Sequence, residues 1–309
     1  MANYVFGIDV GGTSVKCGLF QTDGTLLEKW EIPTRTENGG SEILPDIAKS
    51  VKAKMGEKGI AADDVAGVGI DVPGPVNDKG ELSIAVNLNW GYKNIVKELS
   101  DELGGMAVKA ANDANAAALG EMWAGGGKGS KNLVMVTLGT GVGGGIIVDG
   151  KIGAGGEVGH ACVDPEEEAV CNCGNHGCLE QMTSATGIVR LAKKYLASHD
   201  TPSSLRERGE SISAKAVFDA LKEGDAAAEA IVQEFSAYLG RALAVFACVV
   251  DPEVIVVGGG VSKAGQILID GVAKYYREAA FIACKDTPIV LASLGNDAGI
   301  YGAAKMLID

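Results

Sequence analysis

Residues 4–13 read YVFGIDVGGT, an apolar run that holds one carboxylate, Asp9, and ends in the glycine turn Gly11-Gly12-Thr13. Two more strand-like runs follow, at residues 15–20 and 25–30, and an Asp-Gly pair separates them. Apolar runs broken by short glycine-containing turns are typical of antiparallel strands. This region therefore predicts a β-meander.

The same layout occurs a second time in residues 133–150. An apolar run at 133–138 leads into a glycine-rich segment at 139–145, and a second apolar run at 146–148 is followed by another Asp-Gly pair. We infer that the chain is internally duplicated, with a glycine turn between strands in each copy.

The two glycine turns are candidate phosphate sites, because backbone N–H groups and threonine hydroxyls in such turns can hold an anion. The candidates are Gly11, Gly12, Thr13, Gly139, Thr140, Gly141 and Gly143. A dinucleotide fingerprint would continue into a helix, whereas here residues 146–148 read as strand, and the sequence has no Walker A motif. Either turn alone also fits an ordinary hairpin. Their matching layouts favour a polyphosphate cradled from two sides.

Two charged side chains accompany the first turn. Asp9 ends the first strand, where its carboxylate could hold Mg²⁺ through water against the phosphates. Lys16 follows in the next strand and could offer a positive charge, although most lysines are simply solvated.

Composition limits the class of protein. The chain has 309 residues, 47% of them hydrophobic, and a net charge of −13. This acidity disfavours nucleic acid and anionic membranes, which need basic surface. No apolar run reaches membrane-spanning length, and the first residues lack a signal-peptide pattern. We expect a cytoplasmic protein.

Strand-like and helical patterns alternate along the chain, which predicts an α/β fold in layers. The expected helices are at about 43–55, 95–103, 114–124, 226–249 and 298–307, and the expected buried strands are at 65–72 and 254–257. We place a domain boundary near residue 120. Residues 1–120 with the helix at about 297–309 form one domain, residues 121–296 form the other, and the two are expected to share a cleft.

Three cysteines and a histidine form the densest group of metal-competent side chains. Cys171, Cys173 and Cys178 lie within eight residues, and His160 precedes them. Three thiolates and one imidazole complete a tetrahedral zinc site with no open position, so the metal would be structural. A lone cytosolic cysteine is usually a buried apolar residue. His176 could replace His160 as the ligand, but the spacing and the flanking Glu157 favour His160.

Polar residues that suit a sugar occur in two places. Asn112 and Asp113 stand just before an alanine-rich helix, where Asp113 could be the N-cap or a base that accepts a proton from a hydroxyl. Glu157, His160 and Glu180 bracket the cysteines, and carboxylates can accept hydrogen bonds from adjacent sugar hydroxyls. Surface charge is the alternative for both glutamates.

The chain resembles the ROK family of repressors and sugar kinases over nearly its whole length, and most closely the glucokinases of Gram-positive bacteria. The resemblance is carried by residues 9–13, 73–76, 87–90, 112–115, 138–145, 157–160, 171–180 and 258–260.

The resemblance implies an actin-like, hexokinase-like ATPase fold of two α/β domains around a central cleft that holds ATP with Mg²⁺. It implies Asp113 as catalytic base and zinc held by His160, Cys171, Cys173 and Cys178. Gly259 and Gly260 would lie near the adenosine, and residues 296–299 near the hinge. Sugar contacts are implied for Gly74, Asn112, Asp113, Glu157, His160 and Glu180. Family members are usually homodimers or homotetramers.

The resemblance leaves the sugar open between glucose, fructose and N-acetylhexosamines, with glucose favoured, and leaves the donor open between ATP and polyphosphate. A sugar-responsive repressor would need a helix-turn-helix before the first glycine turn, where only six residues precede Gly7. A chaperone-like or cytoskeletal ATPase would not explain glutamates around a zinc loop. We therefore expect a hexose kinase.

Overall fold

The computed structural model describes residues 2–153 and 155–308, which form two compact units. Within the described residues, unit 1 comprises 2–129 and 296–308, and unit 2 comprises 130–153 and 155–295. Residue 120, where we expected the boundary, lies inside helix α4 (Asp113–Ala124), which belongs wholly to unit 1. Residues 1 and 309, which we assigned to the first domain, lie outside the described residues.

Unit 1 is built on a five-stranded sheet with the order β3-β2-β1-β4-β7. Its strands are β1 (Tyr4–Val10), β2 (Ser14–Gln21), β3 (Leu26–Pro33), β4 (Val65–Val72) and β7 (Val108–Asn112). The first three strands are antiparallel neighbours, as the β-meander predicted, and β4 and β7 continue the sheet in parallel.

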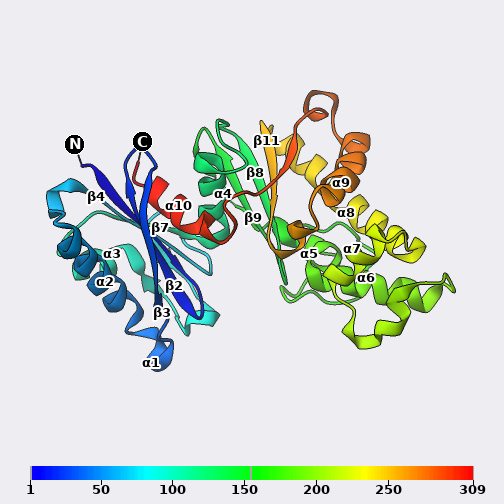
Figure 1. Ribbon diagram of the computed structural model, residues 1–309, viewed down its shortest axis with the longest axis horizontal. Coiled ribbons are helices and arrows are strands. Elements are labelled where there is room, and N and C mark those ends of the chain that lie inside the picture. Colours follow the sequence, from blue (N-terminus) through cyan, green and yellow to red (C-terminus); the bar gives the residue numbers. More distant parts are fainter. Residues whose placement is uncertain (1, 154, 309) are drawn as a thin grey trace. The chain divides into compact units, whose positions relative to one another are not determined.

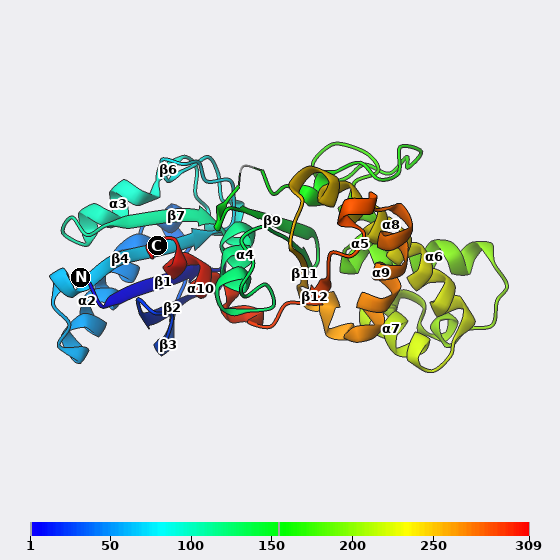
Figure 2. The same ribbon diagram turned by 90° about the horizontal axis from the view of Figure 1, so that it is seen from above.

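Helices cover both faces of this sheet (Figure 1). On one face α2 (Ile43–Lys58) and α3 (Ile95–Glu102) share a buried core with β1 side chains such as Phe6 and Ile8. On the other face α10 (Ala298–Lys305) packs on β1, β4 and α4, and Figure 2 shows it beside β1 and α4. The smaller elements are α1 (Glu37–Gly40), η1 (Ala62–Asp64), β5 (Glu81–Leu82), η2 (Val86–Leu88) and β6 (Lys93–Asn94).

The strands under α10 carry glycines that let the helix approach the sheet. The backbone of α10 lies directly on Gly7 of β1 and Gly69 of β4. Because side chains alternate between faces along a strand, Asp9 and Asp71, each two residues further on, share this α10 face. Ile8 and Ile70, which precede these two aspartates, point to the opposite face of the sheet and into the core beneath α2 and α3.

Unit 2 has a five-stranded sheet with the corresponding order, β10-β9-β8-β11-β12. Its strands are β8 (Leu133–Leu138), β9 (Val142–Val148), β10 (Lys151–Ile152), β11 (Val254–Gly258) and β12 (Ile289–Leu291). As in unit 1, three antiparallel strands are followed by two parallel ones. The shared order confirms the predicted duplication.

The second glycine turn is shorter than we predicted. Residues 143–145 belong to β9, where Gly143 pairs with Thr137, so only residues 139–141 separate the two strands. The prediction of a turn over the whole run was wrong because glycines inside a strand do not by themselves end it.

Helices pack around the unit 2 sheet in one continuous core. The helices are α5 (Leu179–Thr183), α6 (Ala185–Ser198), α7 (Ala214–Lys222), α8 (Ala226–Val250) and α9 (Gln266–Ala279), with 3₁₀-helices η3 (Val158–His160), η4 (Ser204–Ser211), η5 (Gly260–Ala264) and η6 (Ile282–Cys284). The last 3₁₀-helix, η7 (Gly295–Asp297), joins the two units. Among the described residues α8 alone is long and apolar enough to cross a membrane, and 56% of its apolar window is buried in the core.

Candidate functional site

The first glycine turn of unit 1 is fixed from behind by the chain that follows β3. Thr34 donates from its backbone N–H to Thr13 O at 3.0 Å and from Oγ1 to Gly11 O at 2.7 Å. Gly11 N donates to Ser14 O at 3.0 Å. Because the carbonyl groups of Gly11 and Thr13 both accept hydrogen bonds from Thr34, the turn is held in one conformation.

Asp9 and Lys16 lie together beside this turn. Lys16 Nζ is 3.2 Å from Asp9 Oδ2 and also donates to Asn296 O at 3.1 Å. Lys16 is thus a paired residue that joins β2 to the segment before α10.

A carboxylate that we did not predict, Asp71, lies next to Asp9. Asp71 is fully buried, and its two oxygens have no hydrogen-bond partner among the described residues. Burial raises the pKa of Asp71 well above its usual range, and the carboxylates of Asp9 and Asp113 raise it further. Its only sequence signals were a lone charge in the apolar run 65–72 and the four-residue repeat GIDV at 7–10 and 69–72.

Asn112, rather than Asp113, is the N-cap of α4. Its Oδ1 accepts hydrogen bonds from Ala114 N at 3.0 Å and Asn115 N at 3.3 Å, and its Nδ2 donates to Gly74 O at 3.2 Å. Our alternative interpretation of Asp113 as the cap was wrong by one residue. An amide suits this position better, because it can cap the helix and hold Gly74 at the same time.

Asp113 occupies the first turn of α4 with an accessible carboxylate, and its Oδ1 accepts from Ala114 N at 2.8 Å. The surrounding protein atoms remove water from the carboxylate and so raise the pKa of Asp113, and the hydrogen bond from the Ala114 N–H partly opposes that rise. Three of the predicted sugar residues, Gly74, Asn112 and Asp113, are therefore neighbours in unit 1.

In unit 2 the segment that carries the three cysteines, residues 171–178 and here called the cysteine loop, forms a compact ligand cluster with His160. The ligand atoms of His160, Cys171, Cys173 and Cys178 all lie within 4.8 Å of one another. Cys173 Sγ is 3.6 Å from Cys178 Sγ, and Cys171 Sγ is 3.8 Å from His160 Nδ1. A tetrahedron with metal–sulfur bonds of about 2.3 Å has sulfur–sulfur edges of about 3.8 Å. His176 bonds elsewhere, with Nδ1 3.0 Å from Glu168 O.

Glu180 joins the cysteine loop to the second glycine turn. Its Oε2 accepts from Val142 N at 2.9 Å, and Cys171 Sγ lies 3.9 Å from its Oε1. A Cβ at Gly141 would lie only 2.3 Å from Glu180 Oε2, so a larger residue there would displace this carboxylate. Glu157 precedes η3, where its carbonyl accepts from His160 N at 3.1 Å.

The second glycine turn is anchored to α6. Ala185 N donates to Gly139 O at 2.8 Å, and Thr186 Oγ1 donates to Thr140 O at 2.9 Å. As in the first turn, two carbonyl groups of the turn accept hydrogen bonds from a neighbouring segment of the chain, here the start of α6.

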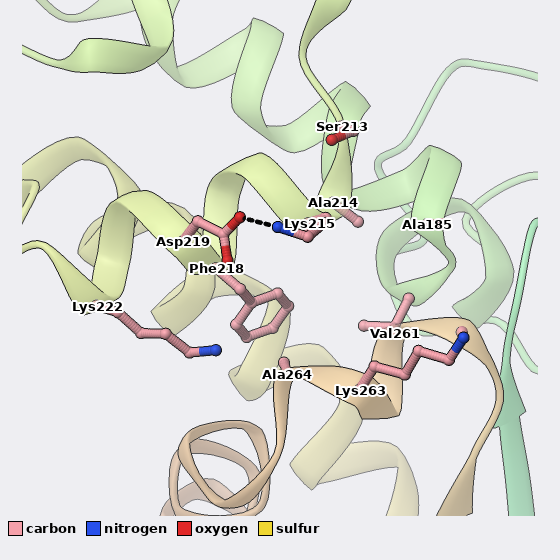
Figure 3. Close-up of a pocket in the computed structure, with 11 residues that line it drawn as sticks. Ala185, Ser213, Ala214, Lys215, Phe218, Asp219, Lys222, Val261, Lys263 and Ala264 are labelled. Atoms are coloured by element: carbon pink, nitrogen blue, oxygen red, sulfur yellow. Dashed lines mark hydrogen bonds and ion pairs between the residues drawn. The ribbon is translucent and has the colours of Figure 1, made fainter.

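A pocket of about 430 Å³ opens beside this turn, entirely within unit 2 (Figure 3). Ala185 of α6, Phe218 of α7 and Gly260 of η5 contribute to its walls, and lysines from α7 and η5 lie at its edge. One of these lysines, Lys215, is paired with Asp219. Gly260 was predicted from sequence, whereas Phe218 and Ala185 were not, because nothing in their local pattern links α6 and α7 to the strand that ends at Gly258.

The chain matches known proteins over nearly its full length. It is 41% identical to a glucokinase of Halalkalibacterium halodurans, covering 96% of this chain and 92% of that protein. It is 34% identical to a glucokinase of Thermotoga maritima, covering 98% and 96%. A ROK family glucokinase of Streptomyces griseus, solved with glucose and AMPPNP, is 31% identical with a TM-score of 0.72, covering 98% of each chain.

The ROK hexokinase of Thermus thermophilus is similar in structure, with a TM-score of 0.80, 30% identity and coverage of 97% and 96%. The fold is accordingly that of the actin-like ATPases, as predicted, and the likeness to sugar kinases extends through both units. The model of the ROK family matches residues 5–309, and the chain belongs to the ROK family.

Proposed function

We propose that this protein is a glucokinase that transfers the γ-phosphoryl group of ATP to the 6-hydroxyl of glucose. Its full-length likeness to bacterial glucokinases carries the proposal. The pairing of Asn112 and Asp113 at the start of α4, with Gly74 bonded to Asn112, supports it at the level of residues.

Asp113 is the proposed catalytic base. Its accessible carboxylate is kept near the helix N-terminus by the Ala114 N–H, which favours the ionised form that accepts a proton. The proton of the 6-hydroxyl passes to Asp113 while the oxygen of that hydroxyl forms a bond to the γ-phosphorus. The bond between that phosphorus and the bridging oxygen breaks, and ADP leaves. Positioning and charge stabilisation supply most of the catalysis in such transfers.

Asn112, Gly74, Glu157, His160 and Glu180 are the proposed sugar contacts, and the two glycine turns are the proposed phosphate contacts. The carbonyls of Gly11, Thr13, Gly139 and Thr140 already bond to the protein behind them. Gly11 N and Gly139 N close the turns on Ser14 O and Gly141 O, so the backbone N–H groups that suit an anion are those of Gly12, Thr13, Thr140 and Gly141.

The chain's carboxylates fit a divalent cation, because two buried oxygens of Asp71 next to Asp9 have no donor. Mg²⁺ supplies charge neutralisation for the phosphates when bound. Asp9 is the residue that would hold it, and Lys16 keeps Asp9 in place.

The His160 and cysteine cluster fits zinc by ligand type and spacing. We assign it a structural role: by fixing Cys171 and His160 it holds Glu180 and the other ring nitrogen of His160 towards the sugar. The pocket at Gly260 is the proposed adenosine site, since its apolar walls suit a purine.

Two further assignments accompany this proposal. We place the enzyme in the cytoplasm, where free thiols persist, because all seven cysteines are unpaired. We also propose a homodimer formed through unit 2, supported by an exposed apolar patch of Val245, Val249, Phe281 and Ile282.

The deciding experiment is steady-state kinetics on a panel of hexoses and N-acetylhexosamines, each with ATP and with polyphosphate. The proposal predicts the highest kcat/KM for glucose with ATP. A wide preference for fructose or for an N-acetylhexosamine would contradict the substrate, and activity with polyphosphate alone would contradict the donor.

A further inference from the structure

Asp9 and Asp71 are equivalent residues of two adjacent strands. β1 and β4 are parallel neighbours, and the register pairs Gly7 with Gly69, Ile8 with Ile70 and Asp9 with Asp71. Adjacent strands lie about 4.8 Å apart, and paired residues in a parallel ladder point to the same face. The repeated sequence GIDV therefore brings two carboxylates into contact at the carboxyl ends of the two strands.

The end of α10 closes over this pair. A Cβ at Gly299 would lie 3.0 Å from Asp71 Oδ2 and 3.0 Å from Asp9 Cγ, so the first turn of α10 touches both carboxylates. The helix N-terminus adds a partial positive potential. No group of α10 donates a hydrogen bond to Asp71, whose two oxygens have no partner among the described residues.

Among the described residues, one positively charged side chain faces the two carboxylates of the pair. Lys16 reaches Asp9 Oδ2 at 3.2 Å but has no contact with Asp71 in the described structure. One further buried acceptor, Oδ1 of Asn115, is also without a partner, and it lies in the first turn of α4, a helix that contacts β4. Buried oxygens with no donor call for a cation or a proton.

We propose, given the proposed kinase function, that Asp71 is a second carboxylate of the divalent-cation site that Asp9 forms. Asp9 is partly exposed, whereas Asp71 is fully buried behind it. Mg²⁺ sites in phosphoryl-transfer enzymes use one or two protein carboxylates together with phosphate oxygens. In this chain β4 supplies the second one, so the cation site is more acidic than one built on Asp9 alone.

The test is Mn²⁺ binding measured by electron paramagnetic resonance on the full chain, without nucleotide, so that activity does not enter. Asp71→Asn keeps the side-chain shape and removes the charge. It should weaken Mn²⁺ binding about 10-fold to 100-fold. Asp78→Asn, an exposed aspartate in the loop after β4, should leave it unchanged.

Unchanged or tighter Mn²⁺ binding by Asp71→Asn would overturn the proposal, because it would mean that a proton balances the pair. A second measurement covers the case in which this variant does not fold. Crystals of the wild-type protein soaked in Mn²⁺ should show an anomalous peak in contact with oxygens of both Asp9 and Asp71. A peak that contacts Asp9 but not Asp71 counts against the proposal.

The two levels of the hypothesis fail separately. If the wild-type enzyme phosphorylates glucose but Asp71→Asn binds Mn²⁺ normally, the proposed function stands and the role of Asp71 is lost. If no sugar is phosphorylated, the function is lost while the Mn²⁺ result still reports on the carboxylate pair.

Discussion

The carboxylate of Asp113 is accessible, yet the surrounding protein removes part of its water and raises its pKa. This pKa determines how the activity of the enzyme should depend on pH. Crowding raises the pKa of Asp113, with the Ala114 N–H acting in the opposite direction. A base works only when ionised, so its contribution is lost as the pH falls through this raised pKa. We expect kcat/KM for glucose to decline on the acid side at a higher pH than an ordinary aspartate would cause. A pH profile of kcat/KM measures this, and an enzyme fully active down to pH 4 would contradict it.

Replacement of the same residue tests its role directly. Asp113→Asn keeps the size of the side chain but cannot accept the proton, so kcat should fall about a hundredfold or more while glucose still binds. Steady-state kinetics and glucose binding by calorimetry check the two parts. Asp101→Asn, at an exposed position of α3, serves as the control. Near wild-type turnover in Asp113→Asn would remove Asp113 as the base.

At the scale of elements, the first residue of β9, directly after the second glycine turn, is coupled to α5 by a hydrogen bond from Val142 N to Glu180 Oε2. Gly141→Ala would place a methyl group 2.3 Å from that oxygen. We expect Glu180 to be displaced, which should raise KM for glucose and for ATP together. Gly56→Ala is the matched control, because a Cβ there meets nothing within 4 Å. If KM changes for neither substrate, Glu180 is not a shared support of the two sites.

The cysteine loop is the second element open to a direct test. Cys173→Ser removes one sulfur of the four-ligand cluster and should reduce zinc from one per chain to nearly none, with a higher KM for glucose. Elemental analysis and kinetics measure both effects. Cys162→Ser, an exposed cysteine outside the cluster, is the control. Wild-type protein purified without chelator and found free of zinc would contradict the assignment.

Local patterns predicted the long elements well. The spacing of Ile43, Ile47 and Val51 predicted α2, and the apolar run before Gly258 predicted β11, because each pattern is a property of one segment. β12 was missed because three residues carry little periodicity. The contact of Asp9 with Asp71 was missed for a different reason. It depends on the register of two strands separated by over fifty residues, which no local pattern encodes.

At the scale of the whole molecule, the apolar patch of unit 2 bears on assembly. Val245 and Val249 are exposed on α8, and η6, which carries the exposed Ile282, is joined to that helix by a contact between Cys284 Sγ and Ala247 O at 3.5 Å. Ile282→Glu would introduce charges into the proposed dimer interface and should produce a monomer. Analytical ultracentrifugation measures the mass. Leu27→Glu, an exposed apolar position in unit 1, is the control. A monomeric wild-type protein would contradict the dimer.

The position of α10 in the chain has a consequence for biosynthesis. This helix covers β1 and β4 of unit 1, yet the whole of unit 2 precedes it in the sequence. The ribosome therefore makes the whole of unit 2 before it makes the helix that lies on Gly7 and Gly69 of the unit 1 sheet. Domains generally fold as they emerge. The pair of aspartates on β1 and β4 should accordingly be enclosed late in folding, only after α10 has left the ribosome.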